Sequence, residues 1–303
     1  MSDRLAGKTA LVVGAGPNIG GTIAHFLARE GARVAVVDRN GAAAAETVGF
    51  LSARGFEALA LTGDALVEAD VERAVAATVE GFGRLDVVVN SAGKVAFRPI
   101  LDLELSEWLE YLTSYPTAGM LTTKYAARAM IAQGGGGSII HLLSTAAHFG
   151  QAAAAAYGSA KAALLNFSRC AAMDFAHDRI RVNTISPCAM EHNLWTGRSA
   201  EIFDPNFVRP HTRAYRSRDD YLKSIPLERF PRASDLAWVV VYLASEESAF
   251  LTGVDIPVDG GLRWKYPAWR PGDFTGLDVI DYAHHIRRTE YGEETAPLFE
   301  PGP

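Results

Sequence analysis

The sequence predicts an α/β fold: a doubly wound parallel sheet between two layers of helices, forming one domain with a C-terminal extension. Short apolar runs alternate along the chain with longer amphipathic stretches, and strand–helix alternation of this kind implies right-handed βαβ crossovers. The apolar runs are continuous rather than interrupted at every second residue, which is typical of parallel strands buried on both faces. A glycine-rich turn between the first run and the first helical stretch is typical of the same fold.

The expected elements follow one another in a regular order. Strands are expected at the apolar runs 9–14, 33–38, 57–64, 85–93, 137–144, 180–187 and 253–261. Helices are expected from the glycine turn to about residue 30, around Tyr157, and over 42–54, 68–83, 106–132 and 235–245. Two segments do not fit the alternation: 191–225, rich in aromatic residues and arginine, and the tail 262–303.

The composition excludes several classes of protein. The chain of 303 residues is 49% hydrophobic and 21% charged, with a formal net charge of −6, so it can form a core and has no basic surface for nucleic acid. Cys170 and Cys188 have neither metal-ligand spacing nor a disulfide pattern, which favours a reducing compartment. The N-terminus lacks the apolar run of a signal peptide, and the longest apolar run, 236–244, is too short to cross a bilayer. We therefore expect a soluble, cytoplasmic protein with no metal, membrane or nucleic-acid partner.

A phosphate-binding turn is predicted from Gly14 to Gly20, where the first strand meets the first helix. Glycines let the backbone approach a pyrophosphate, whose charge lies at the helix N-terminus; the alternative is a plain tight turn. Asp38 ends the second strand 18 residues after Gly20, where a carboxylate would bind the adenosine ribose, unless it caps the next helix. A carboxylate repels a 2′-phosphate and Arg39 beside it attracts one, so NAD is favoured and NADP stays open.

Tyr157 and Lys161 stand four residues apart at the end of an alanine-rich stretch. Because alanine favours helix, the two side chains are expected one turn apart on the same face. One interpretation is a surface helix whose lysine extends its apolar stem along the surface. The other is a phenol whose pKa is lowered for proton transfer. Ser144, 13 residues before Tyr157, ends the fifth strand, either as a plain strand end or as a ligand-facing group.

Together, these motifs resemble those of the short-chain dehydrogenase/reductase family, over residues 5–261. The resemblance implies a Rossmann-like fold and an NAD(P)-dependent oxidoreductase that interconverts a secondary alcohol and a ketone. The matching stretches, each weak alone and specific in combination, are 13–20, Asp64, 90–93, Ser144, 157–161, 187–188 and 258–261.

The resemblance also implies a role for each matching residue. Tyr157 would be the general acid/base, its phenolate favoured by Lys161 and by an oxidised nicotinamide. Ser144 would hydrogen-bond the substrate oxygen, and Lys161 would also hold the nicotinamide ribose. The expected cofactor-binding residues are Gly14, Asn18, Ile19, Gly20, Asp38, Arg39, Asp64, Ala65, Asn90, Ala92, Gly93, Tyr157, Lys161, Pro187, Cys188 and Met190. The expected substrate-binding residues are Ser144, Ala146, His148, Tyr157 and Trp195.

Four positions depart from the family pattern, three of them near the cofactor. Val13 replaces a threonine, Asn18 replaces the middle glycine of the turn, and Cys188 replaces the glycine after Pro187. Asparagine tolerates positive φ better than most residues, so the turn is expected to survive. Cys188 is expected near the nicotinamide, either as a reactive thiol or as a small buried side chain.

The fourth departure concerns a catalytic group. The family has an asparagine on the long fourth helix, seven residues after a tryptophan, and that count from Trp108 reaches Tyr115. The asparagine lies at a helix kink and holds a water that links the lysine to solvent. Pro116 is expected to move Tyr115 out of helical geometry, so that the kink persists without the amide. Either the Tyr115 hydroxyl replaces the amide or its ring fills the pocket; a slip of two residues in the alignment would place Thr117 there.

Residues 1–261 are therefore expected to form the dinucleotide-binding catalytic domain, with a substrate lid at about 191–225. Aromatic side chains in that segment suggest an apolar or cyclic alcohol or ketone, and its arginines leave an acidic substrate open. The aromatic residues that begin the extension 262–303 imply packing, either against another subunit of a homo-oligomer, by resemblance a tetramer, or on the same subunit. The competing function is a non-catalytic dinucleotide sensor or scaffold of the same fold.

Overall fold

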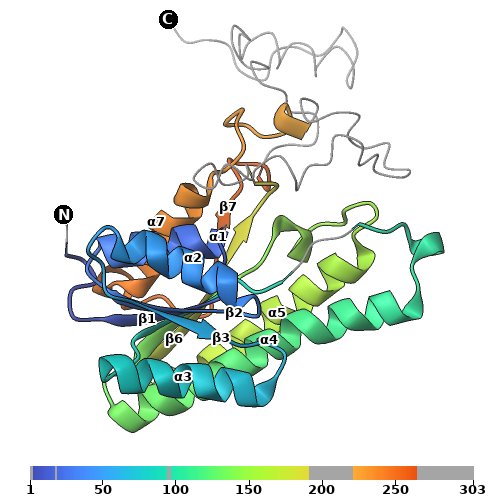
Figure 1. Ribbon diagram of the computed structural model, residues 1–303. Coiled ribbons are helices and arrows are strands. Elements are labelled where there is room, and N and C mark those ends of the chain that lie inside the picture. The colour runs from blue at the N-terminus through green and yellow to red at the C-terminus, as the bar shows by residue number, and fades with distance from the viewer. Residues whose placement is uncertain (1–2, 18, 94–96, 191–220, 265–303) are drawn as a thin grey trace, which may run out of the picture. The chain divides into compact units, whose positions relative to one another are not determined.

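A parallel sheet of seven strands, in the order β3-β2-β1-β4-β5-β6-β7, forms the centre of the described chain in this computed structural model (Figure 1). The structure describes residues 3–17, 19–93, 97–190 and 221–264. The strand order reverses direction between β1 and β4, and doubly wound sheets bind ligands at such a point, beyond the carboxyl ends of the strands. The predicted fold class is confirmed.

Each strand lies inside a predicted apolar run, and several are shorter than the run. The strands are β1 (Thr9–Val13), β2 (Arg33–Asp38), β3 (Ala58–Thr62), β4 (Val87–Asn90), β5 (Gly137–Leu142), β6 (Ile180–Pro187) and β7 (Asp255–Val258). β1 and β4 are buried along their whole length, whereas the edge strands β3 and β7 are partly exposed. Pro257 is found in β7, at the edge of the sheet, where proline is tolerated.

The helices also lie where the amphipathic stretches predict them. They are α1 (Ile19–Arg29), α2 (Gly41–Ser52), α3 (Glu68–Phe82), α4 (Leu105–Gln133), α5 (Ala155–Asp174) and α7 (Ala233–Ala244). The Asn40 side chain caps α2 by accepting from two amides of its first turn. α3 ends at Gly83 with φ of +80°, a conformation that favours glycine.

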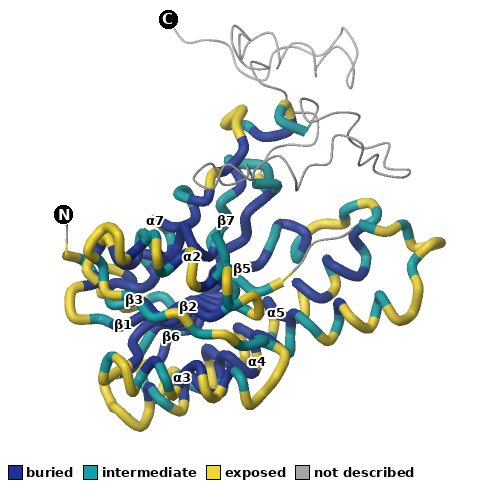
Figure 2. Tube along the Cα trace, viewed as in Figure 1, coloured by how far each residue is buried: buried dark blue, intermediate teal, exposed yellow. Residues whose placement is uncertain are grey.

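Two apolar clusters hold the three layers together. α1, α2 and α7 cover one face of the sheet, and α3, α4 and α5 cover the other (Figure 1). Val12, Ile23 and Val240 belong to the cluster on the first face, while Val13 and Met130 belong to the cluster on the second. The central strands are accordingly mostly dark blue in Figure 2, whereas exposed yellow residues recur along the helices. Burial on both faces explains why the strand sequences do not alternate.

One local expectation is wrong: Tyr115 stays in helical geometry. α4 continues from Leu105 to Gln133 through both Tyr115 and Pro116. Proline removes the hydrogen bond to the carbonyl four residues earlier, but α4 is long and buries an extended face. Its packing therefore outweighs the local preference of a residue that precedes proline.

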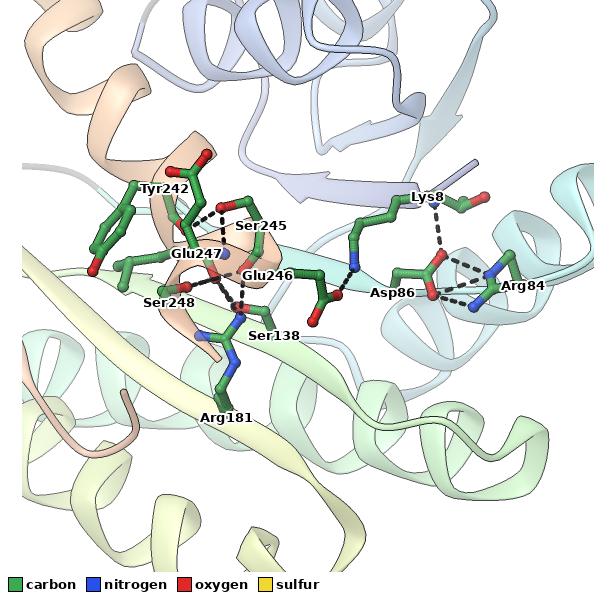
Figure 3. A network of polar contacts seen from close by, with 12 residues as sticks. Lys8, Arg84, Asp86, Ser138, Arg181, Tyr242, Ser245, Glu246, Glu247 and Ser248 are labelled. Atoms are coloured by element: carbon green, nitrogen blue, oxygen red, sulfur yellow. Dashed lines mark hydrogen bonds and ion pairs between the residues drawn. The ribbon is translucent and has the colours of Figure 1, made fainter. Parts of the chain in front are cut away.

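Polar contacts join neighbouring elements at the amino ends of the strands (Figure 3). Arg181, near the start of β6, donates to the carbonyls of Leu243 and Ser245 at 2.7 and 3.3 Å. Ser138 of β5 donates to the same Leu243 carbonyl at 2.7 Å. Asp86, just before β4, accepts from the Thr9 amide at 2.8 Å. These contacts tie the end of α7 to the sheet, which leaves the opposite edge as the place for a functional site.

Several predictions concern residues outside the described part of the chain. They include Asn18, Trp195, most of the predicted lid and the extension from 265 onward. Residues up to Arg263 form one compact unit, and the division into 1–261 and 262–303 stays a prediction. Within the described residues, no helix is long and apolar enough to cross a membrane.

Candidate active site

Three neighbouring strands bring the candidate site residues to one edge of the sheet. Val13 of β1 pairs in register with Asn90 of β4, and Asn90 pairs with His141 of β5. The carboxyl ends of parallel strands lie at the same edge. The segments that follow these strands therefore meet there, and they carry the glycine turn, the 90–93 motif and Ser144.

The glycine turn approaches the segment after β4 too closely for side chains. Gly14 has φ of +76°, and a Cβ there would lie 2.7 Å from Cα of Ala92. A Cβ on Gly20 would lie 2.2 Å from the carbonyl oxygen of Gly14. Ser91 Oγ donates to the carbonyls of Val13 and Gly14, at 3.1 and 2.8 Å. The fold itself thus requires these glycines, and their contact with a pyrophosphate stays a prediction.

Asp38 ends β2 and is bonded to the glycine turn. Its Oδ2 accepts from the Gly16 amide at 3.1 Å, and its Oδ1 accepts from the Asn40 amide at 2.9 Å. The side chain that caps α2 is that of Asn40, so the interpretation of Asp38 as this cap is wrong. Arg39, at the next position, is exposed.

Two polar side chains fix the turns after β3 and β4. Asp64 Oδ1 accepts from the Leu66 amide at 2.9 Å, and the Asp64 amide donates to the Asp70 carboxylate at 2.9 Å. Asn90 is buried, and its Oδ1 accepts from the Ala92 amide at 3.2 Å. These bonds hold the backbone of both turns, where further cofactor contacts are predicted.

Ser144 and Tyr157 interact through their side chains, because the Ser144 hydroxyl acts to lower the pKa of Tyr157. Ser144 begins the short turn η2 (Thr145–Ala147), where its Oγ accepts from the Ala146 amide at 3.2 Å. Tyr157 lies in the first turn of α5 and is buried. Burial raises the pKa of Tyr157 to about 12, and the Ser144 side chain acts in the opposite direction. The expected lowering of this pKa is thus not a property of the chain alone, and a further positive charge is needed to favour the phenolate.

Lys161 lies one turn after Tyr157 and is 5% exposed, so the surface-helix interpretation is wrong. Its Nζ donates to the Leu142 carbonyl at 2.7 Å. The same Nζ lies 4.1 Å from the ring centre of Tyr115 and 5.8 Å from that of Tyr157. Burial lowers the pKa of Lys161 to about 7. The ammonium and amine forms are therefore both present near neutral pH.

Tyr115 packs beside the two candidate catalytic residues of α5. It is buried, and its ring lies 5.7 Å from that of Tyr157, with an angle of 74° between the planes. A Cβ on Gly93 would lie 2.3 Å from Tyr115 Cε1, so the ring occupies the space beside the turn after β4. These contacts favour Tyr115 over Thr117 at the position of the family asparagine.

The structure favours Cys188 as a buried side chain over a reactive thiol. Cys188 is buried with Ile225 and Phe230, directly after the end of β6 at Pro187. Burial raises the pKa of its thiol to about 12, so the nucleophilic thiolate is scarce at neutral pH. Met190, another predicted cofactor contact, packs against the apolar cluster on the α7 side of the sheet.

His148, a predicted substrate contact, belongs to a polar network with β6 and β7. Its Nε2 lies 3.0 Å from Asp255 Oδ2 and 3.2 Å from Ser186 Oγ. Arg263 Nη1 donates to the same Asp255 oxygen at 2.9 Å. Burial lowers the pKa of His148, although the Asp255 carboxylate acts to raise it. A role for His148 in substrate binding stays a prediction.

Sequence reasoning missed two groups in this site. The ring of Tyr111 lies 6.4 Å from that of Tyr157, and its spacing of four residues from Tyr115 on α4 could have indicated a shared face. The carbonyl of Leu142, which accepts from Lys161, had no signal in the sequence because it belongs to the backbone.

The described residues fit a nicotinamide dinucleotide. The glycine turn leads into the N-terminus of α1, and a helix N-terminus suits a pyrophosphate. Each Asp38 oxygen accepts one backbone hydrogen bond and has a second lone pair for a ribose hydroxyl. Lys161 uses one N–H on Leu142, and an ammonium has two more for a second ribose. No group of three or more His, Cys, Asp or Glu in the described ranges could hold a metal ion.

The chain is similar to several known proteins. A family model described as enoyl-(acyl carrier protein) reductase matches residues 14–263. A sorbitol dehydrogenase from Cereibacter sphaeroides is 32% identical over 259 residues, which cover 85% of this chain and 98% of the relative. A D-threitol dehydrogenase from Mycolicibacterium smegmatis is 34% identical over 272 residues, which cover 86% of this chain and 95% of the relative.

A solved structure is also similar to this chain. It is described as a candidate short-chain alcohol dehydrogenase from Sinorhizobium meliloti 1021, and it matches with a TM-score of 0.77 and 32% identity, covering 88% of this chain and 100% of that chain. This chain belongs to the short-chain dehydrogenase/reductase family. As a short-chain dehydrogenase/reductase, it is a member of a family of NAD(P)-dependent oxidoreductases, and the resemblance seen in its motifs is confirmed.

Proposed function

We propose that this short-chain dehydrogenase/reductase uses NAD to interconvert a secondary alcohol and a ketone. The observation that carries the proposal is the juxtaposition of Ser144, Tyr157 and Lys161. The Ser144 side chain acts on Tyr157 to lower its pKa, and Lys161 is buried one turn further along α5. All three lie at the carboxyl edge of the sheet, where the glycine turn and Asp38 also lie.

Ser144, Tyr157 and Lys161 each have a distinct role in the proton transfer. A bound dinucleotide supplies the hydride acceptor for alcohol oxidation and the hydride donor for ketone reduction. Tyr157 Oη takes the hydroxyl proton during oxidation and returns it to the ketone oxygen during reduction. The Ser144 hydroxyl donates to the same substrate oxygen, where negative charge develops. Protonated Lys161 favours the phenolate of Tyr157, so the two groups titrate as a coupled pair.

Asp38 supports NAD over NADP as the cofactor. Its carboxylate is held by the Gly16 and Asn40 amides at the end of β2, where the adenosine ribose is expected. A 2′-phosphate would meet this negative charge at short range and be repelled. The exposed Arg39 beside it is the residue that would favour NADP.

Two observations point to different substrate classes. The aromatic residues of 191–225 favour an apolar or cyclic alcohol, but this segment lies mostly outside the described residues. The relatives named for sorbitol and D-threitol make a polyol the competing class. Both classes contain the secondary alcohol on which the proposed chemistry acts.

An assay of the full-length chain tests this function. NAD and NADP are titrated by calorimetry, and turnover is followed by nicotinamide absorbance with cyclic, acyclic and polyol secondary alcohols. We expect NAD to bind more tightly than NADP and at least one alcohol to be oxidised. Asp38→Ala should reduce the preference for NAD by about tenfold or more, because the repulsion of the 2′-phosphate is lost.

Glu46→Ala is the matched control, since Glu46 is an exposed carboxylate on α2, and it should leave the preference unchanged. Equal or tighter binding of NADP by the unmodified chain would refute the cofactor proposal. Binding of NAD without turnover of any alcohol in the panel would favour the non-catalytic sensor or scaffold.

A further inference from the structure

The Lys161 ammonium lies against the face of an aromatic ring. Its Nζ is 4.1 Å from the ring centre of Tyr115, and it donates one hydrogen bond, to the Leu142 carbonyl at 2.7 Å. A cation within about 6 Å of a ring centre is attracted by the ring quadrupole, more strongly when both groups are out of water. Tyr115 is 4% exposed and Lys161 is 5% exposed. Water therefore weakens this contact little.

We propose that Tyr115 is a positioning residue that holds the Lys161 ammonium with the face of its ring, at the helix position where the family has an asparagine. The inference rests on the proposed function in so far as Lys161 takes part in catalysis. It differs from both earlier interpretations of Tyr115, because the active group is neither a relaying hydroxyl nor a plain wall of the pocket.

The neighbours of Tyr115 fix the ring in the orientation that this role needs. The hydroxyl end of the ring lies against Gly93: a Cβ on Gly93 would be 2.7 Å from Tyr115 Cζ and 2.8 Å from its hydroxyl oxygen. The Tyr111 ring stacks on Tyr115 with an angle of 18° between the planes and 6.3 Å between the centres. The Tyr157 ring meets Tyr115 nearly at a right angle. The face of Tyr115 is thereby directed to Lys161 while its hydroxyl is directed to the turn after β4.

The shift of the Lys161 pKa has burial as its cause. Titratable groups near it include Tyr157 on its own helix, Tyr115 on α4 and His141 on β5, and Tyr111 packs on the two tyrosines. Burial lowers the pKa of His141 to about 3, and the Lys161 charge acts in the same direction, so His141 is neutral. Burial raises the pKa of Tyr157 to about 12, so this phenol is also neutral in the chain alone.

The protonation of Lys161 is therefore sensitive to the ring. Burial lowers the pKa of Lys161 to about 7, where small changes in the stability of the ammonium alter its population. Removal of the Tyr115 ring takes away an attraction that acts on the charged form alone. The pKa of Lys161 should then fall further, whereas removal of the hydroxyl alone should leave this pKa unchanged.

Nuclear magnetic resonance of the full chain carrying ¹³C-labelled lysine tests the inference. The ε-carbon signal of Lys161, assigned by its absence in Lys161→Arg, is titrated with pH in each variant. We expect the pKa of Lys161 to be unchanged in Tyr115→Phe and to fall by about one unit in Tyr115→Leu. Tyr125→Leu is the matched control, since it removes another buried tyrosine ring from α4, and it should leave this pKa unchanged.

Thermal unfolding monitors the fold of each variant, and Tyr115→Met replaces Tyr115→Leu if the latter does not fold. A Lys161 pKa that is equal in the wild type and in the folded ring-deleted variant would overturn the inference. An equal fall in Tyr115→Phe would also overturn it, because the hydroxyl would then be the active group. The readout needs no turnover, so absence of alcohol oxidation would refute the proposed function and leave the ring contact standing.

Discussion

Burial sets the protonation of the candidate catalytic residues. It raises the pKa of Tyr157 to about 12 and lowers the pKa of Lys161 to about 7, so both shifts favour the neutral form. Desolvation always disfavours the charged form of a group, whatever its sign. The site of the chain alone is therefore close to neutral, and the positive charge of an oxidised nicotinamide would change the titration of this coupled pair.

The same effect predicts a low reactivity for Cys188. Burial raises the pKa of the Cys188 thiol to about 12, whereas Cys170 is exposed. At pH 8 about one Cys188 thiol in ten thousand is then ionised, because each unit between pH and pKa is a factor of ten. We expect iodoacetamide to label Cys170 of the folded chain and to leave Cys188 unlabelled, as measured by peptide mass spectrometry. After denaturation both should react. Rapid labelling of Cys188 in the folded chain would contradict the assignment as a buried side chain.

Spacing predicted which residues meet and could not predict their titration. The separation of Tyr157 from Lys161 placed both on one face of α5, as the structure shows. The direction of the Tyr157 shift depends on apolar groups brought together from other elements, and these are not adjacent in the sequence. The ring contact between Tyr115 and Lys161 was missed for the same reason, although Tyr115 itself was found by counting from Trp108.

The helix α4 shows how one element combines local rules with tertiary packing. Tyr115 and Pro116 both lie inside this helix, although proline disfavours helical geometry in the preceding residue. The buried face of α4 carries Tyr111 and Tyr115, one turn apart, toward α5. Gly93 lies beside this face and leaves the space that the Tyr115 ring occupies.

Gly93→Ala should therefore destabilise the fold. Gly93 has φ of +152°, and a Cβ there would lie 2.3 Å from Tyr115 Cε1, so the substitution adds both backbone strain and a clash with a packed ring. We expect the free energy of unfolding in urea to fall by about 1–3 kcal/mol. Gly49→Ala is the control, because Gly49 is helical and a Cβ there meets nothing within 4 Å; it should be neutral or stabilise by about 0.5–1 kcal/mol. A Gly93→Ala variant as stable as the wild type would show that the Tyr115 ring can move away from the added Cβ.

Strands and helices were more predictable than their ends and connections. The apolar runs contained every described strand, but the run 253–261 yields strand over Asp255–Val258 alone. Gly260 and Gly261, with φ of +62° and +90°, then turn the chain. Side-chain bonds to the backbone, such as those of Asp259 with the Gly261 and Arg263 amides, set such ends and have no periodic signal.

In the molecule as a whole, the polar contacts that stabilise the sheet and the candidate site lie at opposite edges of the sheet. Arg181 and its partners tie elements together at the amino edge of the sheet (Figure 3), and the candidate site lies at the carboxyl edge. Apolar side chains are exposed along α4, at Leu105, Leu109 and Met120. They are compatible with an interface between subunits, and the homo-oligomer, tetramer included, stays a prediction.

Turnover of Tyr157→Phe, measured beside its affinity for NAD, tests the central claim most directly. The change removes the hydroxyl that exchanges a proton with the substrate and keeps the ring that packs on Tyr115 and Tyr111. We predict NAD affinity within about twofold of the wild type and a fall in kcat of about a thousandfold, within the range of general acid–base catalysis. Lys161→Ala should weaken both properties, because the lysine is assigned both to the ribose and to Tyr157. A folded Tyr157→Phe variant that keeps more than about a tenth of the wild-type kcat would contradict the account. The loss of the hydroxyl would then slow the reaction by less than general acid–base catalysis typically accelerates it.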